Sequence, residues 1–308
     1  MFLQNIWTAF SQVAMLTILA AVGFCCHKGG LFTESTAKLC NGLLFYIVTP
    51  CVICHSFLRL ERSAETIKLF GIALLWGLVF HLFGVGLTHF LFNKSSSPAV
   101  YKYAAMYGNL GYMGIPLSQA VLGDIGVFIC SVMVFVFNLF AFTHGSAIMN
   151  RAGGGKLKLF KILVNPGTIG ITMGLPLFLL KVQLPAILAE PIEHLSNLNT
   201  PLAMLMLGTY LASTDLKQIF KTRENYTVIF IKLIFLPAVI IGAAVLLGIK
   251  GDLLVGLALM SCAPSASNTV MFAAQYGRDT GRAGMAIACT SIVSILTMPI
   301  WIALAQSV

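Results

Sequence analysis

The sequence predicts an all-α polytopic membrane protein with about ten transmembrane helices, and three observations support this prediction. The chain has 308 residues, of which 58% are hydrophobic and only 9% charged, whereas soluble domains carry roughly 25% charged residues. Apolar stretches of roughly 20 residues recur from one end to the other, and each can cross the hydrocarbon core as a helix. No polar run is left over for a separate soluble domain.

The expected spans follow one another with short connections. The N-terminus has no basic segment and no convincing cleavage site, so the first apolar stretch is a span and not a removable signal peptide. The predicted spans cover residues 6–26, 36–58, 68–92, 101–120, 124–148, 161–180, 192–212, 225–248, 252–275 and 281–304.

A basic, glycine-rich stretch at residues 150–158 is typical of a flexible linker and lies near the middle of the chain. It divides the sequence into two halves, residues 1–150 and 151–308, with five predicted spans each. Because that number is odd, a duplicated second half would be inverted relative to the first.

Two landmarks support such a duplication. Thr49-Pro50 in the second span recurs as Thr200-Pro201 in the seventh, and Pro116 in the fourth span recurs as Pro264 in the ninth. The two separations are nearly equal, so the sequence predicts a five-plus-five inverted repeat, an arrangement common among secondary transporters.

The net charge of +9 does not indicate nucleic-acid binding, because the basic residues are dispersed over short loops. Their distribution instead indicates how the chain is oriented in the membrane. Most of them fall in one alternate set of loops, which the positive-inside rule assigns to the cytoplasm. Both termini are then extracellular or periplasmic, in a bacterial-type plasma membrane. The basic residues expected outside are Arg59, Arg62, Lys68, Lys181 and Lys250.

The fourth and ninth spans each predict a broken helix. Residues 107–116 and 261–269 both combine proline, small residues and an amide side chain at mid-membrane depth. Proline removes a backbone donor, and small residues lower the cost of irregular backbone. The alternative is a smooth glycine stripe at Gly108, Gly111 and Gly114, with the prolines as simple kinks.

A broken helix brings a half-helix N-terminus, with free N–H groups and a partial positive charge, to the membrane centre. Two such termini predict a site for a carboxylate, although unwound carbonyls would equally suit Na⁺. The candidate substrate-binding residues are Thr49, Gly108, Asn109, Gly111, Pro116, Thr200, Ala263, Pro264, Ser265, Ser267 and Asn268.

Four further polar residues are candidates for a support or coupling site. His81, Gln119 and Asn138 lie on spans three, four and five. These side chains would either form a protonatable cluster or make interhelical hydrogen bonds that have no functional role. Lys232 lies roughly 10 Å into the eighth span, so snorkelling to the cytoplasmic surface is the favoured interpretation. No cofactor or metal is expected, and coupling to Na⁺ or H⁺ stays open.

Other classes of protein fit less well. The sequence has no His-Glu-x-x-His, Gly-x-Ser-x-Gly or Walker-type motif, which argues against an intramembrane enzyme. Cys51-x-x-Cys54 has redox spacing but lacks the soluble context of a thioredoxin. Two broken helices at the midplane favour a carrier over a channel, and no output domain supports a receptor.

Residues 107–117, 262–266 and 276–279 resemble the auxin efflux carrier family, which includes the plant PIN auxin exporters and bacterial malate or malonate permeases. The resemblance covers essentially the whole chain. It implies a ten-helix inverted repeat in which spans four and nine cross at their prolines. It also implies a substrate carboxylate near Asn109 and residues 264–268, facing spans two and seven.

The sequence departs from the plant exporters in two respects. Their support site contains acidic residues, whereas the counterparts implied here are His81 and Gln119, with Asn138 nearby. Their long cytoplasmic loop is replaced by a short linker, as in a bacterial relative. The resemblance implies a secondary transporter of a small mono- or dicarboxylate, in which spans one, two, six and seven form a gating or homodimer unit.

Overall fold

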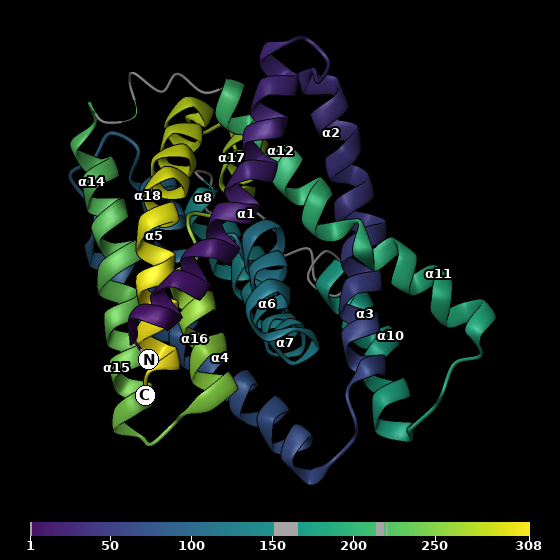
Figure 1. Ribbon diagram of the computed structural model, residues 1–308. Helices are drawn as coiled ribbons and strands as arrows, with labels where there is room; N and C mark the ends of the chain where they lie inside the picture. Colours follow the sequence, from purple (N-terminus) through teal and green to yellow (C-terminus); the bar gives the residue numbers. More distant parts are fainter. Residues whose placement is uncertain (1, 151–165, 214–218, 220) are drawn as a thin grey trace.

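The computed structural model describes residues 2–150, 166–213, 219 and 221–308, and their regular elements are helices (Figure 1). Six helices are long and apolar enough to cross a membrane, and these are Phe10–Lys28, Ser35–Arg59, Ala64–Phe90, Asp124–Met149, Arg223–Leu246 and Thr280–Gln306. Shorter apolar helices accompany them, at Leu110–Leu122, Thr168–Leu180 and Gly251–Ser261. The predicted class, an all-helical polytopic membrane protein, is confirmed.

The first half of the chain has elements that match the predicted spans closely. In order they are α1 (Phe2–Lys28), α2 (Glu34–Leu43), η1 (Leu44–Val48), α3 (Thr49–Arg59), α4 (Ala64–Phe90), α5 (Pro98–Met106), η2 (Leu110–Gly114), α6 (Ile115–Leu122), α7 (Asp124–Phe140), η3 (Ala141–Gly145) and α8 (Ser146–Met149). The η elements are single turns of π-helix.

The second half follows the same order with one further interruption. Its elements are α10 (Pro166–Leu180), α11 (Ala186–Asn197), α12 (Asn199–Ser213), α14 (Arg223–Phe230), η4 (Ile231–Phe235), α15 (Leu236–Leu246), α16 (Gly251–Ser261), α17 (Asn268–Gln275) and α18 (Thr280–Gln306). The predicted linker lies outside the described residues except for Asn150, and so does the start of the sixth span.

The prediction of one continuous seventh span over residues 192–212 is wrong. Helix α11 ends at Asn197 and α12 begins at Asn199, with Leu198 between them. Pro201 explains the interruption, because it has no N–H to donate to the Asn197 carbonyl four residues earlier and its ring clashes with that carbonyl. Apolar composition alone did not reveal the interruption.

Three of the π-helical turns end two residues before a proline, at Pro50, Pro116 and Pro237. A proline ring clashes with the carbonyl four residues earlier and offers no N–H to it. A wider turn absorbs this clash, since a π-helix bonds each carbonyl to the fifth residue onward. In the first turn Thr49 donates both its backbone N–H and its hydroxyl to the Leu44 carbonyl.

Two helix pairs are joined through glycines. Gly23 of α1 lies against the Leu205 backbone of α12, and Gly208 of α12 lies against the Ala20 carbonyl of α1. Helix α10 packs on α3 in the same way through Gly174, whose missing side chain leaves room for Phe57. Glycine lets two helix backbones approach closely in a membrane.

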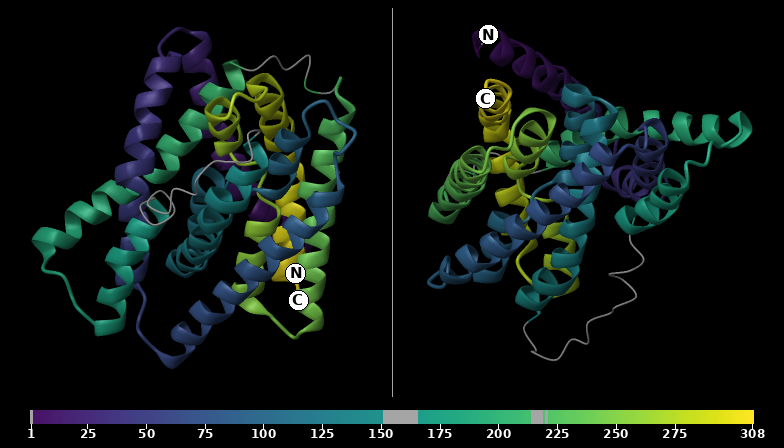
Figure 2. Two further views of the ribbon diagram at one scale, coloured as in Figure 1. Left: turned by 180° about the vertical axis from the view of Figure 1, so that it is seen from behind. Right: turned by 90° about the horizontal axis from the view of Figure 1, so that it is seen from below.

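The views in Figure 2 show how these pairs sit relative to the rest of the molecule. Helices α3, α10 and α11 lie on one side, and α14, α15 and α18 lie on the other. Helices α5, α7 and α16 carry many of the most deeply buried side chains, which include Tyr101, Tyr103 and Phe128. The interrupted spans thus run through the centre of the fold.

Candidate functional site

The two interrupted spans meet where each of them is unwound. Gly108 and Ser265 form an isolated antiparallel bridge. The Asn109 N–H donates to the Pro264 carbonyl at 2.7 Å, and the Ala266 N–H donates to the Tyr107 carbonyl at 2.8 Å. We call this pairing of residues 107–109 with residues 262–267 the crossing. Both predicted helix breaks are therefore confirmed, and each unwound segment satisfies part of the other's backbone.

The local sequence explains why the helices stop here. Tyr107 has extended backbone angles after α5, and Asn109 leaves the helical region before η2. On the other strand of the crossing, Pro264 cannot donate a hydrogen bond, and it disfavours helical angles at Ala263. The chain resumes helical structure at Leu110 and at Asn268.

Four half-helix ends converge on the crossing, two of each polarity. The C-terminal carbonyls of α5 find partners within the protein: the Ser265 hydroxyl donates to the Ala104 carbonyl at 2.7 Å, and the Lys232 ammonium donates to the Met106 carbonyl at 3.3 Å. The N-termini of Leu110–Leu122 and of α17 carry partial positive charge at the same place.

A small cavity of about 40 Å³ lies beside these N-termini, which is room for a few water molecules. Among the residues that the structure describes, its lining is apolar and aromatic with three amide side chains, and contains no lysine, arginine, aspartate or glutamate. The residues around it are Phe45, Thr49, Gly108, Asn109, Leu110, Gly111, Tyr112, Val134, Phe137, Asn138, Ala266, Ser267 and Asn268.

Asn109 is the polar group in this cavity with the clearest unused capacity. Its side chain is 3% exposed, and its Nδ2 has no hydrogen-bond partner within the described structure. A buried amide donor without a partner costs free energy unless water or a ligand satisfies it. The donor therefore stands ready for an acceptor in the cavity.

The predicted substrate-binding residues fall into three groups. Thr49, Gly108, Asn109, Gly111, Ser267 and Asn268 line the cavity. Ala263, Pro264, Ser265 and Pro116 are buried around the crossing and serve its backbone geometry. Thr200 lies partly buried on α12 and does not line the cavity. The hydroxyl of Thr49 donates to the Leu44 carbonyl of its own span at 2.8 Å.

The sequence reasoning missed the apolar wall of the cavity. Phe45, Tyr112, Val134 and Phe137 all contribute to it. A signal was present on α7, because Val134 stands four residues before Asn138 and shares its helical face, and Phe137 stands three residues after Val134. Aromatic residues are so frequent in this chain that their positions in the sequence did not identify the ones that line the cavity.

The snorkelling prediction for Lys232 is wrong. Its side chain is completely buried, and its ammonium lies 5.3 Å from the centre of the Phe80 ring besides contacting Met106. The partial negative charge at the C-terminus of α5 and the face of the ring both stabilise a cation. These partners explain why Lys232 points into the protein and not toward the membrane surface.

His81, Gln119 and Asn138 do not form one buried cluster. His81 is 1% exposed, its Nδ1 lies 2.8 Å from the Gly77 carbonyl, and its ring stacks on Phe140 at 5.1 Å. Asn138 lines the cavity. Gln119 is exposed on α6, since its neighbour Ser118 occupies the inward face of that short helix.

Apolar spanning helices and a central broken-helix crossing define a polytopic membrane protein with an internal polar site. The family described as Membrane transport protein matches residues 8–302, and the chain belongs to that family. This match confirms the resemblance to auxin efflux carriers. The protein is thus a membrane transporter.

Individual relatives agree with this assignment. The chain is 29% identical to a putative malonate transporter of Rhizobium meliloti (strain 1021) over 228 residues, which cover 70% of each protein. It is 25% identical to an uncharacterized transporter of Methanocaldococcus jannaschii over 302 residues, covering 94% of this chain and 96% of the relative. The uncharacterized transporter YfdV of Escherichia coli is 20% identical over 301 residues.

Proposed function

We propose that this protein is a secondary transporter that moves a small organic anion across the plasma membrane by alternating access. The substrate carboxylate binds at the crossing, between the N-termini of Leu110–Leu122 and of α17. The observation that carries the proposal is the buried, unpartnered Asn109 Nδ2 in a cavity that also receives both of these helix ends.

Electrostatics favour an anion in this cavity over a cation. Helix N-termini and amide N–H groups supply partial positive charge, and none of the described residues that line the cavity has a carboxylate to hold a cation. Two carbonyls at the C-terminal end of α5 are engaged by Lys232 and Ser265. A carboxylate would therefore gain hydrogen bonds without competing with a fixed negative charge.

The architecture favours a mechanism in which one group of helices moves against another. We assign residues 1–150 and 151–308 to two inverted five-helix repeats, with about ten transmembrane helices in total. The glycine-mediated pairing of α1 with α12 matches that of α10 with α3, as two inverted repeats require. These four helices form the gating frame, and the crossing bundle rocks against it between inward-open and outward-open states.

The cavity in the described conformation admits only water, so it corresponds to a closed form of the site. Opening between the frame and the crossing bundle is needed before an organic anion enters. Phe45 and Thr49 come from the frame side, whereas Asn109 and Asn268 come from the crossing, so this motion separates the two walls.

The substrate is a small mono- or dicarboxylate. The name of the Rhizobium relative points to malonate for that protein, and its short, doubly charged skeleton suits a site of two helix ends. The aromatic wall at Phe45, Tyr112 and Phe137 also suits a monocarboxylate with an apolar body. Uptake measurements distinguish these two chemistries.

A Na⁺- or H⁺-coupled mechanism is the alternative, because unwound carbonyls at the crossing resemble those of ion-coupled carriers. The uncoupled mechanism is favoured by the lack of an acidic residue in the cavity lining. His81, whose ring lies 6.3 Å from that of Tyr107, and Lys232, which contacts Met106, are the two basic side chains beside the crossing that a proton-coupled mechanism would use.

The test is uptake by the purified chain in proteoliposomes. Acetate, malonate, malate and indole-3-acetate are supplied in turn, each under an imposed Na⁺ gradient, proton gradient or membrane potential. We expect saturable, counterflow-competent transport of at least one carboxylate. Transport that does not saturate, or that admits neutral solutes equally well, would mean a channel and would reject the proposal.

A further inference from the structure

A second, larger cavity lies away from the crossing, where the ends of α3 and α10 meet. Its volume is about 320 Å³, which is within the size range of ligand pockets, roughly 300–1,000 Å³. Phe57, Leu58, Leu177 and Phe178 form its apolar wall. Its polar lining is rich in positive charge and consists of Arg59, Glu61, Arg62, Lys181 and Gln183. We call it the basic cavity.

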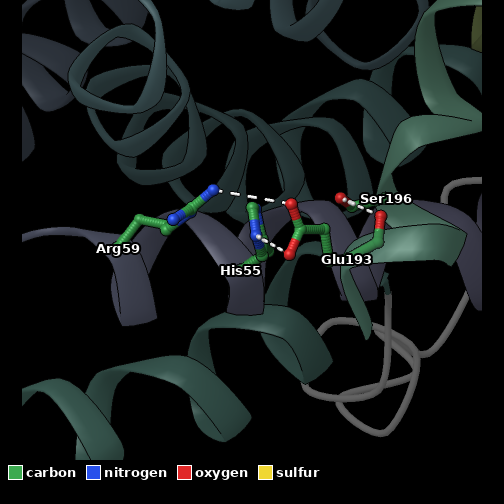
Figure 3. Close-up of polar contacts among 4 residues, drawn as sticks. All are labelled: His55, Arg59, Glu193 and Ser196. Atoms are coloured by element: carbon green, nitrogen blue, oxygen red, sulfur yellow. Dashed lines mark hydrogen bonds and ion pairs between the residues drawn. The ribbon is translucent and has the colours of Figure 1, made fainter. Parts of the chain in front are cut away.

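The charges of the basic cavity are only partly compensated. Arg59 is held by Glu193 of α11, whose carboxylate lies 3.5 Å from the guanidinium and 4.0 Å from His55 (Figure 3). Within the described part of the chain, no carboxylate lies within 4.0 Å of Arg62 or Lys181. Two full positive charges therefore face the cavity without an ion-pair partner.

The backbone at Lys181 indicates that a lysine is unusual at this position. Residues 177–182 close α10 with a Schellman motif, in which the Val182 N–H donates to the Leu177 carbonyl at 2.9 Å. Lys181 occupies the left-handed position of this motif with φ of 54°, where glycine or asparagine is normally found. A long cationic side chain is thus present at a site where local conformation disfavours it.

The positions of these residues fit the boundary between membrane and water. Arg59 and Leu180 are the last residues of helices α3 and α10, so the cavity lies at the end of two apolar helices. Exposed apolar side chains lie close by in the sequence, with Leu180, next to Lys181, 74% exposed and Ile187, four residues after Gln183, 80% exposed. A ligand there contacts positive charge on one side and hydrocarbon on the other.

From this combination we infer that the basic cavity binds the phosphate headgroup of an anionic phospholipid. Arg62 and Lys181 pair with the phosphate, and the acyl chains extend along the exposed apolar surface of α10 and α11. The inference also explains an exception to the positive-inside rule. Arg59, Arg62 and Lys181 lie on the predicted outer face, which this rule expects to be poor in basic residues. The inference is independent of the transported substrate.

The experiment uses the full chain in mixed micelles that contain phosphatidylcholine, titrated with phosphatidylglycerol, with native mass spectrometry as the readout of retained lipid. The test variant is the double substitution Arg62→Gln, Lys181→Gln. The matched control is Lys250→Gln, which removes a basic residue of the same predicted face outside the cavity. Gel filtration checks that all variants stay folded.

We expect the wild-type chain to retain phosphatidylglycerol in preference to phosphatidylcholine. The double variant should weaken that retention on the order of tenfold, because two charge contacts are lost. The Lys250→Gln variant should bind as the wild type does. Unchanged retention in the double variant would overturn the inference. Equal or tighter binding of inorganic phosphate or glycerol 3-phosphate would also overturn it, since the ligand would then be a soluble anion.

Discussion

The Lys232 ammonium donates to the Met106 carbonyl at 3.3 Å, so a residue of the eighth predicted span stabilises the end of a half-helix in the fourth. Gly108, two residues further on, is close to the same amine: a Cβ there would lie 3.0 Å from Nζ. The positive charge therefore lies directly behind the backbone that forms the crossing. It contributes to the potential in the cavity without lining it.

The first prediction concerns the charge of Lys232. Replacing Lys232 with Met keeps most of the side-chain volume and removes the buried charge. We expect a folded protein, since an apolar replacement of a buried charge is often neutral or stabilising. The KM for the transported anion should rise on the order of tenfold, because a unit charge near the site is lost. Lys250→Met serves as the control, and an unchanged KM in Lys232→Met would contradict the role assigned to this charge.

The second prediction concerns the free donor at the crossing. Asn109→Ala removes Nδ2, and Asn109→Asp keeps the shape while adding a negative charge. We expect Asn109→Ala to weaken transport by a factor on the order of ten, as for one lost hydrogen bond to a charged group. Asn109→Asp should abolish transport of an anion at neutral pH. If both variants transport as the wild type does in proteoliposomes, the carboxylate does not bind at this position.

The third prediction concerns the contact between α1 and α12. A side chain at Gly208 would meet the Ala20 backbone of α1. Gly208→Ala should therefore destabilise the protein by roughly 1–3 kcal/mol, as overpacking does elsewhere. Gly242→Ala on α15 is the matched control, because no atom lies within 4 Å of the added Cβ. Thermal unfolding in detergent measures the difference, and equal midpoints for both variants would exclude a close helix contact.

The fourth prediction follows from the uncharged lining of the cavity. A monovalent anion that crosses without a coupling ion carries net charge, so transport should produce a current. A potential of about 100 mV contributes roughly 2.3 kcal/mol per charge, which suffices for nearly 50-fold accumulation. Currents on solid-supported membranes loaded with proteoliposomes measure this directly. Electroneutral flux that stops when a Na⁺ or proton gradient is removed would instead establish coupling.

The fifth prediction concerns orientation. Lys94 lies in the loop between α4 and α5, and Lys250 precedes α16 at the opposite end of the predicted topology. Cysteines introduced at these two positions should react with a membrane-impermeant maleimide from opposite sides. We expect Lys250→Cys to be labelled in intact cells and Lys94→Cys only after the membrane is opened, with the parent chain as the reference for its own cysteines. The reverse pattern would invert the orientation.

Sequence reasoning succeeded where the cause of a structure is local. Pro264 acts on the backbone within a turn of its own position, and Gly108 and Asn109 lie in the other break itself, so the broken helices were predictable from residues nearby. The pairing of the two breaks was also expected, from the repeated landmarks and from the family resemblance. Its register, with Gly108 opposite Ser265, depends on packing across the fold and needed the structure.

The errors have a common physical origin in partners that lie far away in the sequence. Snorkelling was expected for Lys232 because its distance to the surface is short, but the carbonyl that binds it belongs to Met106. The apolar wall of the cavity from Phe45 to Phe137 likewise comes from separate spans. Helical periodicity describes one face of one helix, and it does not specify which faces meet.

The two hydrogen bonds that join residues 107–109 to residues 264–266 involve only backbone N–H and C=O groups. The apolar side chains that line the cavity take no part in them, so these side chains can vary without breaking the crossing. A substitution at Phe45 or Phe137 would reshape the wall that the solute meets and leave the helix ends in place. In evolutionary terms, the scaffold separates the ability to hold an anion from the choice of which anion is held, so new specificities are within reach of single mutations.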